Sequence, residues 1–159
     1  MFRKMRRKTQ ELSFGECEAI LNSCTSGVLA VSGDEGYPYA VPLSYVYSDN
    51  KIYFHCAKSG HKLDAVEKCS KASFCVIAKD DILPEKYTTL FKSVIVFGKI
   101  RVLKTAVEME EPIKILTRKY VKIEEQDIMQ EFLRAKENMY MLCLDIEHIS
   151  GKQCRELVK

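Results

Sequence analysis

Very short connections join the first strand-like segments of this 159-residue chain. Gly27–Gly33 is followed by the turn Asp34-Glu-Gly36, and Tyr37–Tyr47 by the turn Ser48-Asp-Asn-Lys51. Such links are too short for the crossover that parallel strands need, so an antiparallel sheet is predicted. The remaining strand-like segments are Lys51–Ala57, Ala72–Lys79, Lys92–Leu103 and Met139–His148. Six strands that must hide their edges in a chain of this length indicate a closed or partly closed barrel.

The second of these segments, Tyr37–Tyr47, contains Pro38 and Pro42. Proline has no N–H to donate to a neighbouring strand, so it is rare in the centre of a sheet. We therefore predict that this strand lies at an edge, carries a bulge or runs beside a ligand.

Segments with helical patterns flank the strands. A capping box at Ser13–Glu16 begins one helix, and Gly60–Lys68 is predicted to form a second. Another capping box lies at Thr105–Glu108, but Pro112 favours a regular helix that starts at this proline. A last segment carries an apolar face made of Ile128, Met129, Phe132 and Leu133.

Length and composition are those of one globular domain, which we expect to span residues 1–159. The longest apolar runs, such as Val28–Val31 and Val94–Phe97, are far shorter than a membrane-spanning helix requires. The charged start of the chain is not followed by the apolar stretch of a signal peptide. These features predict a cytoplasmic protein with no membrane partner.

Positive charge is concentrated at the start of the chain. Residues 1–10 form a basic arm with five Lys and Arg residues, whereas the rest of the chain has 20 basic and 22 acidic residues. A basic arm can contact phosphates, but it is also typical of a solvated tail or of a segment that crosses to a second subunit. Since the rest of the chain carries a net charge of −2, we expect no nucleic-acid partner.

The seven cysteines are scattered and include no C-x-x-C pair, which argues against a zinc ribbon or a thioredoxin-type motif. The three histidines, His55, His61 and His148, are not spaced as a metal site, so no bound metal is expected. Reduced, mostly structural cysteines agree with a cytoplasmic location.

The polar residues that could take part in binding or catalysis lie in two stretches, Tyr39–Ser44 and Phe54–Lys62. The second stretch is a strand, a loop with Gly60, and a helix start that bears His61 and Lys62. A helix N-terminus exposes free N–H groups and a partial positive charge, so this arrangement suits a phosphate or a carboxylate. The pattern is equally that of a solvated helix start with ordinary surface charges.

His55 lies within a predicted strand, between Phe54 and Cys56. It could be a half-buried histidine bonded to a backbone carbonyl, or a residue that takes part in catalysis. A Cys56–His55 catalytic pair is excluded because neighbouring strand residues point to opposite faces of a sheet.

Several motifs resemble the nitroimidazole-resistance (Nim) family of flavoproteins, which belongs to the pyridoxamine 5′-phosphate oxidase-like, FMN-binding split-barrel superfamily. The resemblance lies in Gly36-Tyr-Pro-Tyr-Ala-Val-Pro-Leu-Ser-Tyr-Val-Tyr47 and Tyr53-Phe-His-Cys-Ala-Lys-Ser-Gly-His-Lys62. Phe91-Lys-Ser-Val-Ile-Val-Phe-Gly98, Asp145-Ile-Glu-His-Ile-Ser-Gly-Lys152 and the opening Met5-Arg-Arg-Lys8 also resemble the family. The similarity covers nearly the whole chain.

The resemblance implies a mainly β fold with flanking helices, namely a six-stranded antiparallel split β-barrel. It also implies a homodimer that holds FMN, with FAD as the alternative cofactor, at the subunit interface. The flavin ring would lie along Tyr39, Ala40, Val41, Pro42, Leu43 and Ser44. The other matching positions are Phe54, His55 and Ser93 beside the ring, and His61 and Lys62 at the phosphate. His55 matches the histidine that the Nim family places by the flavin and is the candidate catalytic residue.

One departure narrows the activity. Oxidase members of the superfamily usually have an arginine where this chain has His61, and they end in a substrate segment with Arg and Trp. This chain ends in Cys154-Arg-Glu-Leu-Val-Lys159 and has no tryptophan. The resemblance thus favours an FMN-binding oxidoreductase that reduces small electrophiles such as 5-nitroimidazoles, with a small-molecule electron donor. The alternatives are a haem-binding or haem-degrading split barrel and a non-catalytic flavin-binding protein.

Overall fold

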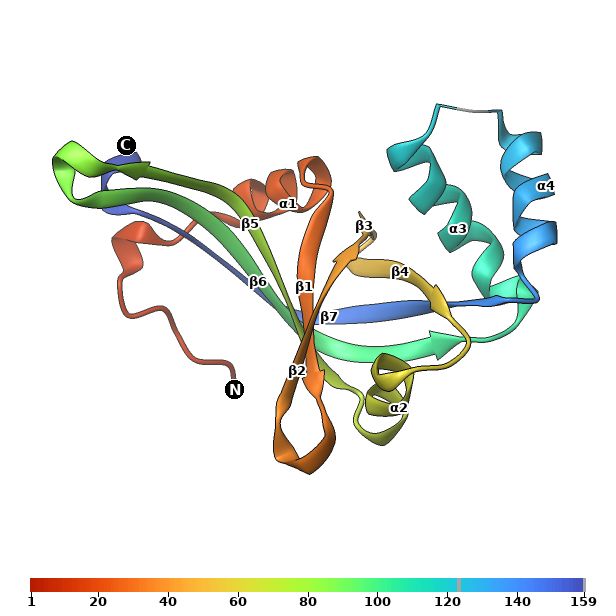
Figure 1. Ribbon diagram of the computed structural model, residues 1–159. Helices are drawn as coiled ribbons and strands as arrows, with labels where there is room; N and C mark the ends of the chain where they lie inside the picture. Colours follow the sequence, from red (N-terminus) through yellow and green to blue (C-terminus); the bar gives the residue numbers. More distant parts are fainter. Residues whose placement is uncertain (123, 159) are drawn as a thin grey trace.

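Seven antiparallel strands form the centre of the molecule in the computed structural model, which describes residues 1–122 and 124–158 (Figure 1). Their order in the sheet is β2-β1-β5-β6-β7-β4-β3. The strands are β1 (Ser26–Ser32), β2 (Pro38–Ser44), β3 (Val46–Ser48), β4 (Lys51–Ala57), β5 (Lys71–Leu83), β6 (Thr88–Leu103) and β7 (Met139–Gln153). The antiparallel prediction is confirmed, and the sheet is strongly curved but not closed, with β2 and β3 at its two edges.

The predicted count of six strands is wrong because the segment 37–47 is broken at Tyr45 into β2 and β3. The Tyr45 side chain is fully buried, and its hydroxyl donates a hydrogen bond to the Leu21 carbonyl oxygen at 2.8 Å. This anchor turns the chain out of β2 and into β3, so that one predicted strand contributes to both edges of the sheet.

The two prolines of β2 lie where they remove no ladder hydrogen bond. Among the described residues β2 pairs only with β1, so it is an edge strand, the first of the three predicted arrangements. At the start of the hairpin, the Gly33 N–H donates to the Tyr37 carbonyl oxygen. Because bonding alternates along an antiparallel pair, the N–H positions of Pro38 and Pro42 face away from β1.

Strands β5 and β6 are longer than predicted and form an extended hairpin that projects away from the helices α3 and α4 (Figure 1). Pairing continues from Ser93 opposite Ile77 to Thr88 opposite Leu83, with a register shift between Ile77 and Lys79. The outer half of this hairpin has no buried face. Its sequence therefore lacks the alternation of apolar and polar residues that marks a half-buried strand.

Apolar side chains pack in two regions. Inside the curved sheet, Phe54, Phe74 and Leu29 are fully buried, and α1 (Phe14–Ser23) closes this core with Leu21. A second cluster lies on the outer side of β4 and β7 beneath α3 (Ala106–Tyr120) and α4 (Glu125–Ala135). Its buried members are Val46, Leu103, Met109, Leu116, Phe132, Met141 and Cys143.

The capping boxes predict the helix starts correctly. Ser13 and Glu16 exchange the expected bonds at α1, and α2 (His61–Lys68) follows Gly60. The expectation that α3 starts at Pro112 is wrong, because Thr105 and Glu108 also exchange capping bonds and begin the helix at Ala106. Pro112 is therefore buried inside the helix.

The fourth predicted helix, α4, buries Ile128 and Phe132, and Phe132 belongs to the second cluster. Leu133, which the pattern placed on the same face, is 54% exposed. No helix within the described ranges combines the length and apolar character required to cross a bilayer.

Candidate functional site

Two strand edges without ladder partners come together in this fold. One is the outer edge of β2, and the other is the part of β4 from Phe54 to Ala57, which pairs with β7 but extends beyond its pairing with β3. At one end, Ser44 and His55 line a common cavity. At the other end, the rings of Tyr39 and His61 stack with centroids 4.1 Å apart. We call this region the seam: β2 on one side, residues 54–62 on the other.

The His61 end of the seam is held by Asp34, a residue that sequence analysis did not select. The His61 Nε2 atom lies 3.5 Å from Asp34 Oδ2, and Lys68 bonds the other carboxylate oxygen at 2.8 Å. The bond and charge of Lys68, together with His61, hold the pKa of Asp34 below its usual value. A Cβ atom at Gly33 would lie 2.7 Å from the Tyr37 carbonyl oxygen and 3.4 Å from His61 Nε2, so this position needs glycine.

Lys62 is the second residue of α2 and lies beside backbone N–H groups that have no acceptor within the helix. Gly60 is the N-cap, with φ of 125° and no side-chain cap, and its carbonyl accepts from the N–H groups of Leu63 and Asp64. The N–H groups of His61 and Lys62 are left to face outward. Lys62 is half-buried and makes no ion pair with any residue that the structure describes. Burial raises the pKa of the Cys56 thiol, and the positive charge of Lys62 counteracts part of this increase.

The opposite end of the seam opens into a cavity of about 320 Å³ beneath α3. His55 is exposed on the outer side of β4, while its neighbours Phe54 and Cys56 are buried, as predicted for alternating strand residues. The other lining residues are Ser44, Ile113, Leu116, Thr117, Tyr120, Val121 and Met139. Sequence analysis missed the residues of α3 and Met139, because they lie far from His55 in the chain and carry no motif.

Tyr120 fastens the end of α3 to the break between β2 and β3. Its hydroxyl oxygen accepts a bond from the Tyr45 N–H at 3.0 Å and lies 2.7 Å from the Tyr45 carbonyl oxygen. The preceding residue, Lys119, donates to the Cys24 carbonyl oxygen at 2.6 Å and lies 4.1 Å from the centre of the Tyr45 ring. These contacts fix the position of Ser44, which adjoins the break.

We expect Tyr120→Phe to destabilise the protein by about 1–3 kcal/mol, because the buried Tyr45 N–H loses its acceptor. For a chain of this length, the melting temperature should fall by about 2–4 °C for each kcal/mol. Thermal unfolding followed by circular dichroism measures the effect. The matched control is Tyr37→Phe, since Tyr37 is 75% exposed and should tolerate the change. Equal melting temperatures for Tyr120→Phe and the parent would contradict the role of the hydroxyl.

The residues expected to bind a cofactor divide between the two faces of β2. Ala40, Pro42 and Ser44 are exposed, whereas Tyr39, Val41 and Leu43 are half-buried and pack on the core. The structure thus brings together this strand, His55, His61 and Lys62.

Two expected residues lie apart from these. Phe54 is fully buried, and its ring packs against Phe74 with centroids 5.1 Å apart, so only its backbone can reach a ligand in the seam. Ser93 is on β6, which β1 and β5 separate from β2.

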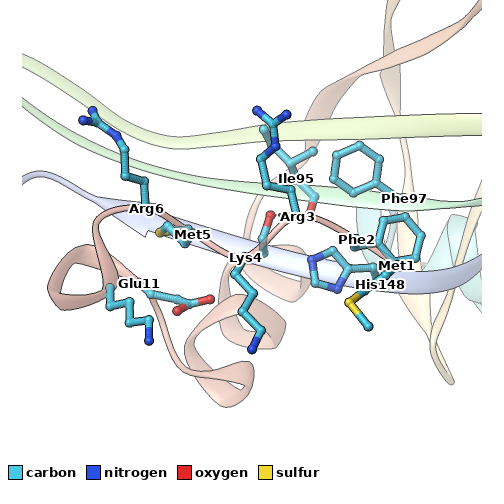
Figure 2. A pocket seen from close by; sticks show the side chains of 12 residues that line it. Met1, Phe2, Arg3, Lys4, Met5, Arg6, Glu11, Ile95, Phe97 and His148 are labelled. Atoms are coloured by element: carbon cyan, nitrogen blue, oxygen red, sulfur yellow. Dashed lines mark hydrogen bonds between the residues drawn. The ribbon is translucent and has the colours of Figure 1, made fainter.

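A larger cavity, about 730 Å³, lies between the N-terminal arm and the outer side of β6 and β7 (Figure 2). The Phe2 ring stacks on His148 with centroids 4.7 Å apart, and Phe97 lies beside both rings. None of the residues expected to bind a cofactor lines this cavity. It is therefore separate from the seam.

Comparison with known proteins assigns the fold. A family model described as "Pyridoxamine 5'-phosphate oxidase" matches residues 13–153. No curated protein sequence matches the chain.

Solved structures share the arrangement at low sequence identity. A candidate 5-nitroimidazole antibiotic resistance protein from Bacteroides thetaiotaomicron has a TM-score of 0.77 and 17% identity, and the match covers 90% of this chain and 86% of that one. An FAD-binding protein from Mesorhizobium loti has a TM-score of 0.64 and 24% identity, with 91% and 97% covered. An FAD and haem binding protein from Mycobacterium smegmatis has a TM-score of 0.73 and 17% identity, with 92% and 74% covered.

Proposed function

The chain belongs to the pyridoxamine 5′-phosphate oxidase family, and on this premise we propose that it binds a flavin, FMN or FAD, along the seam. The observation that carries the proposal is a strand edge without a ladder partner beside a lysine without an ion pair, both within residues 1–122 and 124–158. β2 offers backbone groups along Pro38–Ser44, and Lys62 offers a positive charge where α2 exposes its first N–H groups. A planar ring with a phosphate-bearing chain has the shape and charge that this combination accommodates.

Each part of the seam has a distinct task in this proposal. Lys62 and the N–H groups of His61 and Lys62 bind the phosphate, and the stacked Tyr39 ring orients His61. The flavin ring lies along Tyr39–Ser44, with the backbone of Phe54 and the side chain of His55 across from it. Both FMN and FAD carry a phosphate next to the ribityl chain, so the same residues serve either cofactor.

We further propose that the protein is an oxidoreductase that reduces small electrophiles such as 5-nitroimidazoles. A bound flavin supplies the electrons. Conversion of a nitro group to a nitroso group consumes two electrons and two protons and releases water, so the site must also deliver protons. His55 is exposed, lines the cavity at the seam and carries an imidazole, the side chain most suited to proton transfer near neutral pH. The likeness in fold to the nitroimidazole-resistance candidate supports this acceptor class.

Release and identification of the bound cofactor, followed by anaerobic reduction, tests the proposal. We expect flavin absorption bands from the purified protein, and reoxidation of the reduced flavin by 2-methyl-5-nitroimidazole. A strong Soret band without flavin would instead support a haem protein, the second ligand named for the Mycobacterium smegmatis structure. If the protein binds flavin but no nitroaromatic acceptor reoxidises it, the result would support a non-catalytic flavin-binding protein.

A homodimer that shares the flavin is the proposed assembly. The outer side of the sheet, away from the core, carries apolar residues on adjacent strands, including Val28, Cys75, Ile77, Ile95 and Phe97. Ile77 is 63% exposed and Ile95 39% exposed, as expected of a surface that a second copy covers. In a dimer, Ser93 on this same side can reach the flavin of the partner subunit.

We expect Ile77→Asp to convert the dimer into a monomer, because the change places a charge on the most exposed of these apolar residues. Light scattering should give twice the chain mass for the parent and the single chain mass for the variant. The control is Val107→Asp, at a position on α3 that is 86% exposed and lies outside the surface. A parent that binds flavin as a monomer would refute the proposed assembly.

We also propose a cytoplasmic location. All seven cysteines are free, and several are buried within the core, as in proteins that remain in a reducing compartment.

A further inference from the structure

The start of the chain is packed closely against the end of β7. The Leu12 N–H donates to the Gly151 carbonyl oxygen at 2.9 Å, and a Cβ atom at Gly151 would lie 2.9 Å from Leu12 Cβ. Two short 3-10 turns flank this contact, Lys8–Gln10 before Leu12 and Arg155–Leu157 after β7. Residues of both turns line a common cavity of about 930 Å³. The contact between the two segments therefore fixes the walls of this cavity relative to each other.

Positive charge dominates the lining of this cavity. Its basic residues are Arg6, Arg7, Lys8 and Arg155, and none of these side chains forms an ion pair within residues 1–122 and 124–158. No aspartate or glutamate is among the described residues that line it. Like charges held near one another repel unless an anion binds between them. Arginine presents a planar fork of N–H groups that suits the oxygen atoms of a phosphate.

A buried amide group supplies the second polar feature of the cavity. Gln10 lines the cavity and is 6% exposed, and its Oε1 atom has no hydrogen-bond partner among the described residues. A buried acceptor without a donor is unfavourable, so the missing partner is a group that donates a hydrogen bond. A ligand that completes the site therefore carries a hydroxyl or amino group as well as an anionic group.

The cavity is separate from the flavin site, since none of the residues assigned to the seam lines it. Arg6 and Lys8 also line the neighbouring cavity of about 730 Å³, but Figure 2 shows the Arg6 side chain directed away from the rings of Phe97 and His148. The volume of about 930 Å³ lies within the range of small-molecule sites. It leaves room for a ligand that spans the basic residues and Gln10.

We propose that this cavity binds a small phosphomonoester that also carries hydroxyl groups, which is the chemistry of a sugar phosphate. Arg7, Lys8 and Arg155 bind the phosphate group, and a hydroxyl group of the ligand donates to Gln10 Oε1. The binding requires no flavin, so the proposal goes beyond the proposed function and does not rest on it.

Isothermal titration calorimetry with three probes tests the site. The probes are D-ribose 5-phosphate, methyl phosphate and D-ribose, used at pH 8 and low salt, first with the purified protein and then in the presence of excess FMN. Methyl phosphate has the same charged group but no hydroxyl group. Ribose 5-phosphate should bind about three- to tenfold more tightly than methyl phosphate, which is the gain expected from one neutral hydrogen bond. D-Ribose should give no measurable binding, and excess FMN should change neither affinity.

Variants separate the two parts of the site. Gln10→Met keeps the length of the side chain but removes its carbonyl oxygen, so ribose 5-phosphate should then bind no more tightly than methyl phosphate. Arg155→Ala should weaken the binding of both phosphates about tenfold, because a charge-assisted bond is lost. The matched control is Arg3→Ala, an exposed arginine of the same arm that does not line the cavity, and it should bind as the parent does. Gln10→Leu repeats the test if Gln10→Met does not fold.

Equal affinities for the two phosphates in the parent, or an unchanged preference in the folded Gln10 variants, would overturn the proposal. Equal losses in Arg155→Ala and Arg3→Ala would also overturn it, because the arm would then attract anions without a defined site. A short single-stranded RNA that binds more tightly than ribose 5-phosphate and displaces it would identify a nucleic-acid contact instead.

The same titrations distinguish this site from the flavin site. Displacement of ribose 5-phosphate by FMN would place both ligands in the seam, which would refute the second site and leave the proposed function standing. Binding of ribose 5-phosphate, with the expected effect of Gln10→Met, in a protein that takes up no flavin would support the cavity and refute the proposed function.

Discussion

Replacement of Lys62 by alanine is expected to weaken FMN binding by about 10- to 150-fold. Lys62 is half-buried at the start of α2 and has no carboxylate partner among residues 1–122 and 124–158. A charge-assisted hydrogen bond to a phosphate is worth about 1.5–3 kcal/mol, which corresponds to this range of affinity. Fluorescence titration of the flavin-free protein with FMN measures the loss.

Two controls separate the phosphate contact from other effects. Riboflavin has no phosphate, so Lys62→Ala and the parent should bind it about equally. Lys58→Ala removes the same charge from the preceding loop, where Lys58 is exposed and lies 5.2 Å from the centre of the Tyr140 ring. It should retain most of its affinity for FMN. Equal losses for FMN and riboflavin in Lys62→Ala would show that the substitution damages the fold rather than the phosphate contact.

Local chemistry made much of this fold predictable. A capping box needs only four consecutive residues, and both capping boxes occur where Ser13 and Thr105 predict them. The turn after β3 places Asp49 and Asn50 at positive φ, which these residue types tolerate. The edge position of β2 follows from the missing N–H groups of Pro38 and Pro42. In each case the cause and its effect lie within a few residues of one another.

The features that sequence analysis missed arise from contacts between distant segments. The break that makes a seventh strand depends on the Tyr45 hydroxyl reaching α1 and on Tyr120, 75 residues away, reaching the Tyr45 backbone. The extension of β5 and β6 depends on backbone pairing between the two strands, whose outer halves carry only exposed or half-buried side chains. The start of α3 is determined by a capping box seven residues before Pro112, and the helix continues through this proline.

The candidate site divides in the same way. One part of the site could be predicted because its residues are close to one another in the sequence. This part consists of Tyr39–Ser44 and of Phe54–Lys62, which form a strand, a loop and a helix start. Asp34 was missed because its role depends on how the first hairpin folds against α2. The α3 side of the cavity was missed because Ile113 and Thr117 are ordinary residues of an amphipathic helix, which become part of a site only when Tyr120 fastens that helix to β2.

Replacement of His55 by glutamine is expected to slow reoxidation of the reduced flavin by a nitroaromatic acceptor by about 10²–10⁴-fold, the usual contribution of general acid–base catalysis. His55 is exposed at the point where the seam meets the α3 cavity, so its ring can reach an acceptor that lies beside the flavin. Glutamine has a similar reach and can form hydrogen bonds, but it cannot transfer a proton in the same way. A role in packing or hydrogen bonding alone should therefore survive the change.

The measurement is stopped-flow reoxidation with 2-methyl-5-nitroimidazole across pH 5–8, at matched flavin occupancy, for the parent, His55→Gln and His148→Gln. His148 is the control because it stacks on Phe2 on the outer side of β7, and it does not line the α3 cavity. Its variant should react as the parent does, since it loses an imidazole at a distance from the proposed acceptor. If His55→Gln is as fast as the parent at every pH, the proton must come from solvent or another group, and His55 serves only to position the ligand. A loss confined to His55→Gln, with flavin affinity unchanged, identifies the imidazole as the proton donor.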